Sequence, residues 1–305
     1  RVAIRSENGF QLTPVVMPQS IALLERAFAK DPKFALASAL LGRAHMYMYF
    51  FGADRSDERL KTAKDAADAA LRLQPELGPG HFALAFYWYW GFRDYAHASA
   101  ELELARKTMP QNFDVEEIGA AIVRRQGKWE QALEGLRQAA VYDPRNSSPA
   151  FELGQTYAQL RRYAEADKGY ARAAELSADP ALSQIRRAQN TLVWKGDLEP
   201  LRATLSALSP ESDAFRASQP ALFDLHWLSR DFPGAVKVAE QSDQPIWLFS
   251  RGNSVLPREI RLAWAVAAAG DAARAKTIYE KVHAQAQESM RQKPADWDRH
   301  MAVAL

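Results

Sequence analysis

The sequence contains no cysteine. This absence excludes disulfide bonds, thiolate zinc sites and a cysteine nucleophile. It leaves the compartment open, because a chain without disulfides can fold in the cytosol or in the periplasm. Glycine and proline are also few, 15 and 16 among 305 residues, and they fall at intervals and not in clusters. A glycine-rich phosphate loop, a dinucleotide fingerprint and a Gly-x-Ser-x-Gly elbow are all missing.

An excess of charge of either sign is missing too. Lys and Arg number 39 against 37 Asp and Glu, a net charge of +2. Nucleic-acid binding needs a concentrated basic surface, so we expect no nucleic-acid partner. The longest apolar run, Phe82–Trp90, is about half of the roughly 18 residues that a spanning helix needs, so we expect no direct membrane insertion.

The two ends of the chain indicate a piece of a longer protein. The chain begins at Arg1, without Met or a signal-like segment. It ends in the apolar helical pattern Met301–Leu305, which no terminating residue follows. An unfinished terminal helix leaves an apolar edge, which makes self-association through the last repeat a second expectation.

The residues that are abundant favour helices. Ala, Leu, Glu and Arg dominate, apolar residues recur at spacings of three and four, and β-branched residues are sparse. Five prolines close Ala-rich helical patterns and stand 43, 35, 34 and 36 residues apart. These prolines are Pro32, Pro75, Pro110, Pro144 and Pro180. A repeating unit of about 34 residues with small insertions fits this spacing.

Alignment on the prolines brings other positions into register. Small or apolar residues recur twelve, eight and five positions before each proline, with a two-residue slip in the fifth unit. The sets are Ser20, Leu24 and Ala27; Ala63, Ala67 and Ala70; Ala98, Leu102 and Ala105; Ala132, Leu136 and Ala139; Ala166, Tyr170 and Ala173. Earlier in a unit comes Leu153-Gly154, with Tyr157 three residues later, or Leu41-Gly42. Inter-helix turns are indicated at Gly127-Lys128, Gly196-Asp197 and Gly270-Asp271.

These motifs resemble the tetratricopeptide repeat, a helix-turn-helix unit of 34 residues. The resemblance covers roughly residues 20 to 305. It implies an all-α fold, a right-handed α-α superhelix of about eight repeats. A helix pair of this kind cannot bury its apolar stripe alone, so the pairs have to stack.

The resemblance also suggests a domain organisation. Residues 1–17 show no clear helical pattern and are predicted to be a linker or a partial repeat. Residues 18–241 hold repeats 1 to 7, with an overlong second repeat near Tyr47–Arg55. Residues 242–256 form a connecting loop and the best candidate for a hinge. Residues 257–305 hold a further repeat and the start of another, from about Trp297.

Catalytic and metal-binding patterns are not found. The histidines are His45, His81, His97, His226, His283 and His300, and none has the His-Glu-x-x-His spacing of a zinc helix. We therefore expect a non-catalytic protein with no metal and no cofactor.

The family resemblance implies a ligand-binding groove lined by the first helix of each pair. Its usual register in this family points to eleven residues as partner-binding candidates. They are Phe82, Phe86, Tyr89, Trp90, Arg124, Arg125, Phe151, Gln155, Arg186, Asn190 and Trp194. The two-carboxylate clamp of some family members is absent, because Phe82, Phe86, Ile118 and Phe151 stand at its positions.

Two features of this groove have two interpretations each. The dense aromatic run from Phe82 to Phe92, with Tyr47, Tyr49, Phe50 and Phe51, is either a thick local core or an apolar pocket. Arg124, Arg125 and Arg186 form either a basic stripe for a carboxylate or acidic peptide, or a solvated face with compensating carboxylates.

The function predicted from these observations is a scaffold that binds a protein or peptide in the groove. The alternative is a sensor domain with a small molecule or lipid in the aromatic pocket of repeats 2 and 3. A weaker resemblance, over Leu23–Pro32 and Trp194–Leu198, is to the C-terminal repeat regions of bacterial signalling proteins. In those proteins the repeats follow a cyclase, winged-helix or kinase domain, which implies a regulatory arm here.

Overall fold

The computed structural model describes residues 9–50, 54–244, 246–248 and 255–292. Within this part of the chain lie fifteen α-helices, one π-helical turn and one two-stranded ribbon. The first helices are α1 (Gly9–Lys30), α2 (Ala35–Phe50), α3 (Asp57–Leu73), α4 (Gly78–Phe86) with the π-helical η1 (Tyr87–Gly91), α5 (Tyr95–Thr108), α6 (Phe113–Arg125), α7 (Trp129–Tyr142) and α8 (Ser147–Gln159). They are followed by α9 (Tyr163–Leu176), α10 (Ala181–Lys195), α11 (Glu199–Ser206), α12 (Asp213–Leu228), α13 (Phe232–Gln241), β1 (Ile246–Leu248), β2 (Val255–Pro257), α14 (Arg258–Ala268) and α15 (Ala272–Gln292).

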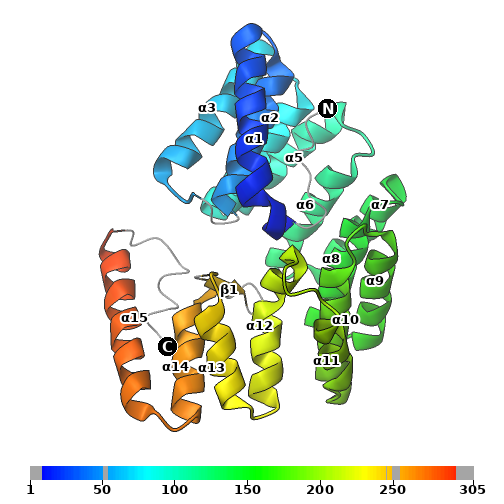
Figure 1. Ribbon diagram of the computed structural model, residues 1–305. Helices are drawn as coiled ribbons and strands as arrows, with labels where there is room; N and C mark the ends of the chain where they lie inside the picture. The colour runs from blue at the N-terminus through cyan, green and yellow to red at the C-terminus, as the bar shows by residue number, and fades with distance from the viewer. Residues whose placement is uncertain (1–8, 51–53, 245, 249–254, 293–305) are drawn as a thin grey trace. The chain divides into compact units, whose positions relative to one another are not determined.

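The helices follow α1 as seven consecutive pairs, from α2 and α3 to α14 and α15 (Figure 1). The prediction of an all-α repeat fold is confirmed. The chain divides into two compact units, which are described separately below. Unit 1 extends to Thr156 and includes Glu175–Ala178, whereas unit 2 holds Tyr157–Ala174 and the chain from Asp179 onward. This division lies within α8 and α9, while the 242–256 segment was the predicted hinge.

The backbone repeats as regularly as the sequence. In six of the seven pairs, the turn between the two helices has one residue with a left-handed φ between 53° and 100°. These residues are Arg93, Gly127, Arg161, Gly196, Arg230 and Gly270. Glycine adopts this conformation without steric cost, whereas arginine adopts it with some strain. The glycine turns were therefore visible in the sequence, and the arginine turns were not.

Small residues on the second helices form the inter-helix contacts, as the repeat register predicts. The alanines of the register are at most 2% exposed: Ala63, Ala67, Ala70, Ala98, Ala105, Ala132, Ala139, Ala166 and Ala173. Each predicted closing proline from Pro75 to Pro180 lies beyond the end of its helix. The residue before a proline disfavours the helical region, which ends these helices.

The contact between α2 and α3 depends on Gly42. A Cβ atom at this position would lie 2.9 Å from the carbonyl oxygen of Ala63 and 3.2 Å from the amide nitrogen of Ala67. Both atoms belong to the backbone of α3, so only a shift of the whole helix could relieve the contact. This close approach explains the glycine of the Leu41-Gly42 motif.

We expect Gly42→Ala to destabilise unit 1. Overpacking of a core costs roughly 1–3 kcal/mol, which exceeds the helix-propensity gain of up to about 1 kcal/mol from removing a glycine. The matched control is Gly119→Ala in α6, where the new Cβ would meet the flexible end of Arg106 at 3.0 Å. Urea denaturation followed by circular dichroism measures both. Equal stability of the two variants would contradict the role assigned to Gly42.

The structure differs from the expected organisation in two segments. Helix α1 begins at Gly9, inside the segment 1–17 that was predicted as a linker or partial repeat. Its Met17, Ile21 and Leu24 are buried against α2, and this packing outweighs the helix-breaking tendency of Pro14 and Pro18. Residues 1–8 lie outside the described part.

The predicted connecting loop 242–256 contains β1, which pairs antiparallel with β2 through Ile246 and Pro257, Trp247 and Leu256, and Leu248 and Val255. Residues 249–254, and the predicted start of another repeat at Trp297, lie outside the described part of the chain.

Candidate functional site

The aromatic run forms a core and not an open pocket wall. Phe82 and Phe86 are each 1% exposed and Tyr89 is 7% exposed. Trp90 is half-buried and stacks on Phe50, with ring centroids 4.2 Å apart. Its ring also lies 4.2 Å from that of Phe86. The rings therefore fill the space between one another, as the core interpretation states.

This burial corrects the predicted site. Phe82, Phe86 and Tyr89 were expected to contact a partner, but the packing of α2, α3, α5 and α6 around α4 and η1 encloses them. The helix changes from α to π at Tyr87, which widens the turn by one residue; Tyr89 is buried there, and Tyr87, Trp88 and Trp90 pack partly buried against the same core. Of the four candidates within this aromatic run, Trp90 alone keeps a partly accessible ring.

The other candidates of unit 1 lie on the surface formed by α2, α4, α6 and α8, the first helices of its pairs. We call this surface (residues 35–50, 78–86, 113–125 and 147–156) the A-face. Arg124 connects α6 to α8, because its NH2 lies 2.7 Å from Glu152 Oε2 and its NH1 donates to Thr156 Oγ1 at 2.8 Å. Burial disfavours the charged guanidinium, and the Glu152 carboxylate outweighs this effect and raises the pKa of Arg124. Arg124 is thus already compensated within the chain.

Further contacts fix the same two helices. Ser148 Oγ donates to Glu117 Oε1 at 2.9 Å, and Gln155 Nε2 donates to Glu152 Oε1 at 2.9 Å. The structure thereby brings two predicted residues, Arg124 and Gln155, together through a shared glutamate. Phe151 is half-buried on the same helix, and Arg125 is exposed.

The A-face also contains a cation that the sequence analysis missed. Arg43 in α2 lies over the ring of Phe82, with its Cζ 5.7 Å from the ring centroid. Its NH1 is 3.9 Å from Asp114 Oδ2, and its side chain is 16% exposed. The sequence contained a signal for Arg43. This residue directly follows the Leu41-Gly42 motif and stands at the repeat position that Phe86 occupies in the next repeat.

The three candidates of unit 2 lie on α10 but have different environments. Asn190 is 4% exposed, and its Nδ2 donates to the carbonyl oxygen of Tyr163, so it ties α10 to α9. Arg186 is half-buried and donates from NH1 to Gln189. Trp194 is 44% exposed, with Lys195 Nζ 4.6 Å from its ring centroid. Asn190 therefore has a structural role, and Trp194 is the candidate of this helix whose side chain is most accessible to a partner.

An ion pair in unit 2 between a buried arginine and a carboxylate whose side chain is 27% exposed was not predicted. Arg261 in α14 is 1% exposed, and its NH1 donates to Asp224 Oδ1 in α12 at 2.8 Å. Burial raises the pKa of Asp224 above its usual value, although Arg261 and Arg186 both act in the opposite direction. The two residues lie 37 positions apart in the sequence, so no local pattern reveals that they pair.

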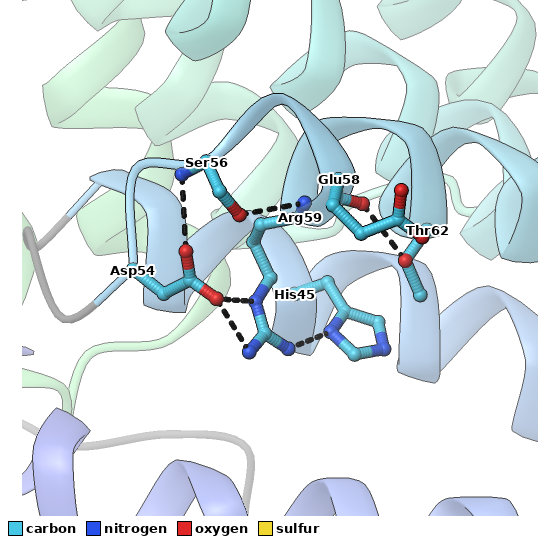
Figure 2. A network of polar contacts seen from close by, with 6 residues as sticks. All are labelled: His45, Asp54, Ser56, Glu58, Arg59 and Thr62. Carbon is cyan, nitrogen blue, oxygen red and sulfur yellow. Dashed lines mark hydrogen bonds and ion pairs between the residues drawn. The ribbon is translucent and has the colours of Figure 1, made fainter.

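Four of the five described histidines each lie beside a charged side chain, and the fifth, His283, contacts Gln287. Figure 2 shows the most buried of them, His45, whose Nδ1 lies 2.6 Å from Arg59 NH1. Asp54 accepts from Arg59 and from the amide of Ser56, so this network holds the loop before α3. Within the described part of the chain, no group of three or more His, Cys, Asp or Glu residues could hold a metal ion. In the same part, no helix is long and apolar enough to cross a membrane.

A cleft of about 270 Å³ lies between α5, α6 and α7 in unit 1. Gly119 and Gly135 line it together with Arg106. Arg106 Nε donates to Glu116 at 3.0 Å, and its NH1 bonds Glu103, so one guanidinium holds two carboxylates. The three charged side chains that line the cleft are thereby paired with one another.

No family model matches the sequence, and no curated protein matches it. Solved structures do match. A tetratricopeptide repeat protein from Parabacteroides merdae is 16% identical, with a TM-score of 0.55 over 88% of this chain and 98% of its own. A thermophilic tetratricopeptide repeat protein from Thermus thermophilus is 19% identical, with a TM-score of 0.51 over 61% of this chain and 100% of its own.

Human IFIT1, solved as a dimer with PPP-AAAA, is 16% identical and has a TM-score of 0.56. The match covers 94% of this chain but only 63% of the IFIT1 chain. At these identities the likenesses establish the fold alone, which is that of a tetratricopeptide repeat solenoid.

Proposed function

We propose that this tetratricopeptide repeat chain is a non-catalytic scaffold that binds a peptide or protein segment on the A-face. The observation that supports the proposal is the fixed polar surface of α6 and α8. Glu117 and Ser148 hold each other at 2.9 Å, and Arg124 and Glu152 at 2.7 Å. A surface whose side chains are already ordered loses less entropy when a partner binds. Protein interaction is also the general role of this fold.

Accessible groups for partner contact border this fixed surface. On the A-face, Arg125 is exposed, and Phe151 and Gln155 are half-buried; Trp90, in η1 directly after α4, is half-buried too. Aromatic residues and arginine are the side chains that most often dominate binding energy at interfaces. In unit 2, Trp194 offers a similar exposed ring.

The sensor alternative has less support. It needs an aromatic cavity in repeats 2 and 3, and the rings of Phe82 and Phe86 are almost fully enclosed by their neighbours. The role as the regulatory arm of a larger bacterial protein remains part of the proposal, on the sequence resemblance alone.

We further propose that the partner is not a nucleic acid, although human IFIT1 was solved with PPP-AAAA. The 39 basic and 37 acidic residues of this chain provide no excess for phosphate binding. Self-association through the last repeat also remains a proposal, and sedimentation velocity at several protein concentrations tests it.

Site-specific photo-crosslinking tests the proposed binding face. A photo-reactive residue at Gln155 on the A-face is compared with one at Arg137, on the exposed surface of the second helix α7. We expect the Gln155 probe to form a defined adduct with one partner, and the Arg137 probe to form none with that partner. An Arg125→Glu change combined with the Gln155 probe should reduce this adduct severalfold. An adduct from Arg137 alone, or with an RNA oligonucleotide, would count against the proposal.

A further inference from the structure

We propose that Arg43 anchors the partner by binding the carboxylate of an acidic side chain. This inference rests on the proposed function, because it names the chemistry that the A-face recognises. Arg43 was not among the predicted partner-binding residues, and its surroundings distinguish it from the other arginines of this surface.

The first argument is the incomplete bonding of Arg43. Among the described residues, its guanidinium forms no hydrogen bond, and its one ion pair, to Asp114, spans 3.9 Å. Its Nε is buried and has no acceptor. Arg124 on the same face has nearly the same exposure, 14% against 16%, yet it has a carboxylate at 2.7 Å and a hydroxyl at 2.8 Å. The Arg43 side chain is 84% buried, and a buried Nε without an acceptor is costly to the fold.

The second argument concerns the ligand whose acceptors would complete the hydrogen bonding of Arg43. A guanidinium has five N–H donors in a planar fork, which match the two oxygens of a carboxylate. Because Nε is closed to solvent, a partner reaches Arg43 through its terminal nitrogens. Phe82 lies beneath the guanidinium and excludes water from one side, which strengthens an ion pair formed on the other.

The nearby Asp114 does not prevent this binding. One guanidinium can hold two carboxylates, as Arg106 does in this chain with Glu103 and Glu116. The other acidic groups of the A-face are engaged at close range, Glu117 with Ser148 and Glu152 with Arg124. The carboxylate that completes Arg43 therefore has to come from outside this surface.

An acidic side chain fits the A-face better than a terminal carboxylate does. Arg43 lies on α2, and Arg125 lies at the end of α6, two repeats further along the same face. One extended segment can present acidic side chains to both arginines, whereas it has only one C-terminal carboxylate. The expected ligand is thus an internal segment with at least one Asp or Glu.

A peptide array measures this chemistry directly. The full chain is probed with C-terminally amidated 12-residue peptides that contain or lack Asp and Glu, and with neutral peptides that end in a free carboxylate. We expect the amidated acidic peptides to bind, and Arg43→Gln to weaken the best of them at least tenfold in fluorescence anisotropy. Arg43→Lys should restore only part of the affinity, because lysine lacks the planar fork. The matched control Arg137→Gln, on the second helix α7, should leave it unchanged.

The outcomes separate the inference from the proposed function. Peptide binding that Arg125→Glu abolishes but Arg43→Gln leaves intact overturns the inference and keeps the binding face. Binding only by free C-terminal carboxylates overturns the choice of an acidic side chain. If no peptide binds the wild-type chain, both the binding face and the inference fail.

A second readout needs no partner. If Arg43 is kept for binding, Arg43→Met should leave the Tm unchanged or raise it, because it removes a largely buried charge whose only ion pair among the described residues spans 3.9 Å. Arg124→Met should lower the Tm, because it leaves Glu152 without its cation. Equal losses in the two variants would make Arg43 a structural residue and overturn the inference.

Discussion

The Asp224→Ala variant should lose about 3–5 kcal/mol of the free energy of unfolding of unit 2, which is typical of a broken buried ion pair. Arg261 is 1% exposed, and Asp224 is the carboxylate that its NH1 contacts at 2.8 Å. Removing Asp224 takes away the carboxylate that Arg261 NH1 contacts, whereas the carbonyl oxygen of Pro220 stays at 3.4 Å. Urea denaturation measures the loss, and hydrogen exchange assigns it to α12 and α14.

Two controls make this prediction specific. Asp213 belongs to the same helix and pairs with Arg216, but both side chains are more than half exposed. Asp213→Ala should therefore change the stability by no more than about 0.5 kcal/mol. A loss at Asp213 equal to that at Asp224 would mean that burial of the pair is not the cause.

The double variant Asp224→Leu with Arg261→Met gives the opposite expectation. Burial raises the pKa of Asp224 despite the two nearby arginines, so desolvation of its charge outweighs their attraction. An ion pair of this kind is often replaceable by apolar residues without loss. We expect the double variant to be more stable than Asp224→Ala and close to the wild-type chain. An additive loss in the double variant would show that the pair itself stabilises the fold.

Much of the fold followed from the sequence, because the repeat is local. Prolines at intervals of about 34 residues, and alanines at fixed positions before them, identify the second helices, and the structure buries those alanines. Gly42 marked a close helix contact, and Gly127, Gly196 and Gly270 marked turns. Each of these signals lies within a single repeat.

The features that the sequence did not predict depend on contacts between distant segments. Pro220 lies inside α12, where it removes an N–H that the carbonyl of Arg216 would accept. The side chain of Gln244, 28 residues after Arg216, donates to that carbonyl at 2.9 Å and satisfies it. No pattern around Pro220 could indicate this bond, and none around Asp224 could indicate its partner Arg261.

The candidate site was predicted less well than the fold for a related reason. The family register identifies which positions of a first helix face the groove, but not how deeply each side chain is buried. Phe82 and Phe86 occupy such positions and are core residues, because the neighbouring helices α2, α3, α5 and α6 enclose them. Arg43 occupies an equivalent position, and only its distances to Asp114 and Phe82 show that it lacks close partners.

The second large effect concerns pH and the buried His45. We expect the free energy of unfolding of unit 1 to fall by roughly 3 kcal/mol as the pH is lowered from 6.5 to 4. Burial, and secondarily the positive charge of Arg59, lower the pKa of His45 from 6.5 to about 4. Arg59 NH1 lies 2.6 Å from His45 Nδ1 and must donate, so the ring accepts there and is neutral (Figure 2).

The direction of the effect follows from proton binding. Between pH 6.5 and 4 the unfolded chain protonates His45 and the folded chain does not, so each added proton favours unfolding. The contribution of neutral His45 to the free energy of unfolding is complete above pH 6.5 and is lost as the pH falls toward 4. Asp54 responds in a separate range, because hydrogen bonds from Ser56 and then Arg59 lower its pKa from 3.8 to about 2. Its contribution is lost only below pH 3.8.

The His45→Gln variant isolates the histidine. Glutamine can accept the Arg59 hydrogen bond through its amide oxygen but does not titrate, so the variant should lose most of the pH dependence between 6.5 and 4. The matched control is His97→Gln in α5, whose histidine side chain is 65% exposed and pairs with Asp94 at 2.6 Å. Urea denaturation at half-unit pH intervals gives the slope for each chain. A slope that persists in His45→Gln, or disappears in His97→Gln, would place the titrating group elsewhere. If His45→Gln alone flattens it, the burial of His45, supported by Arg59, accounts for both the neutral ring and the acid sensitivity of unit 1.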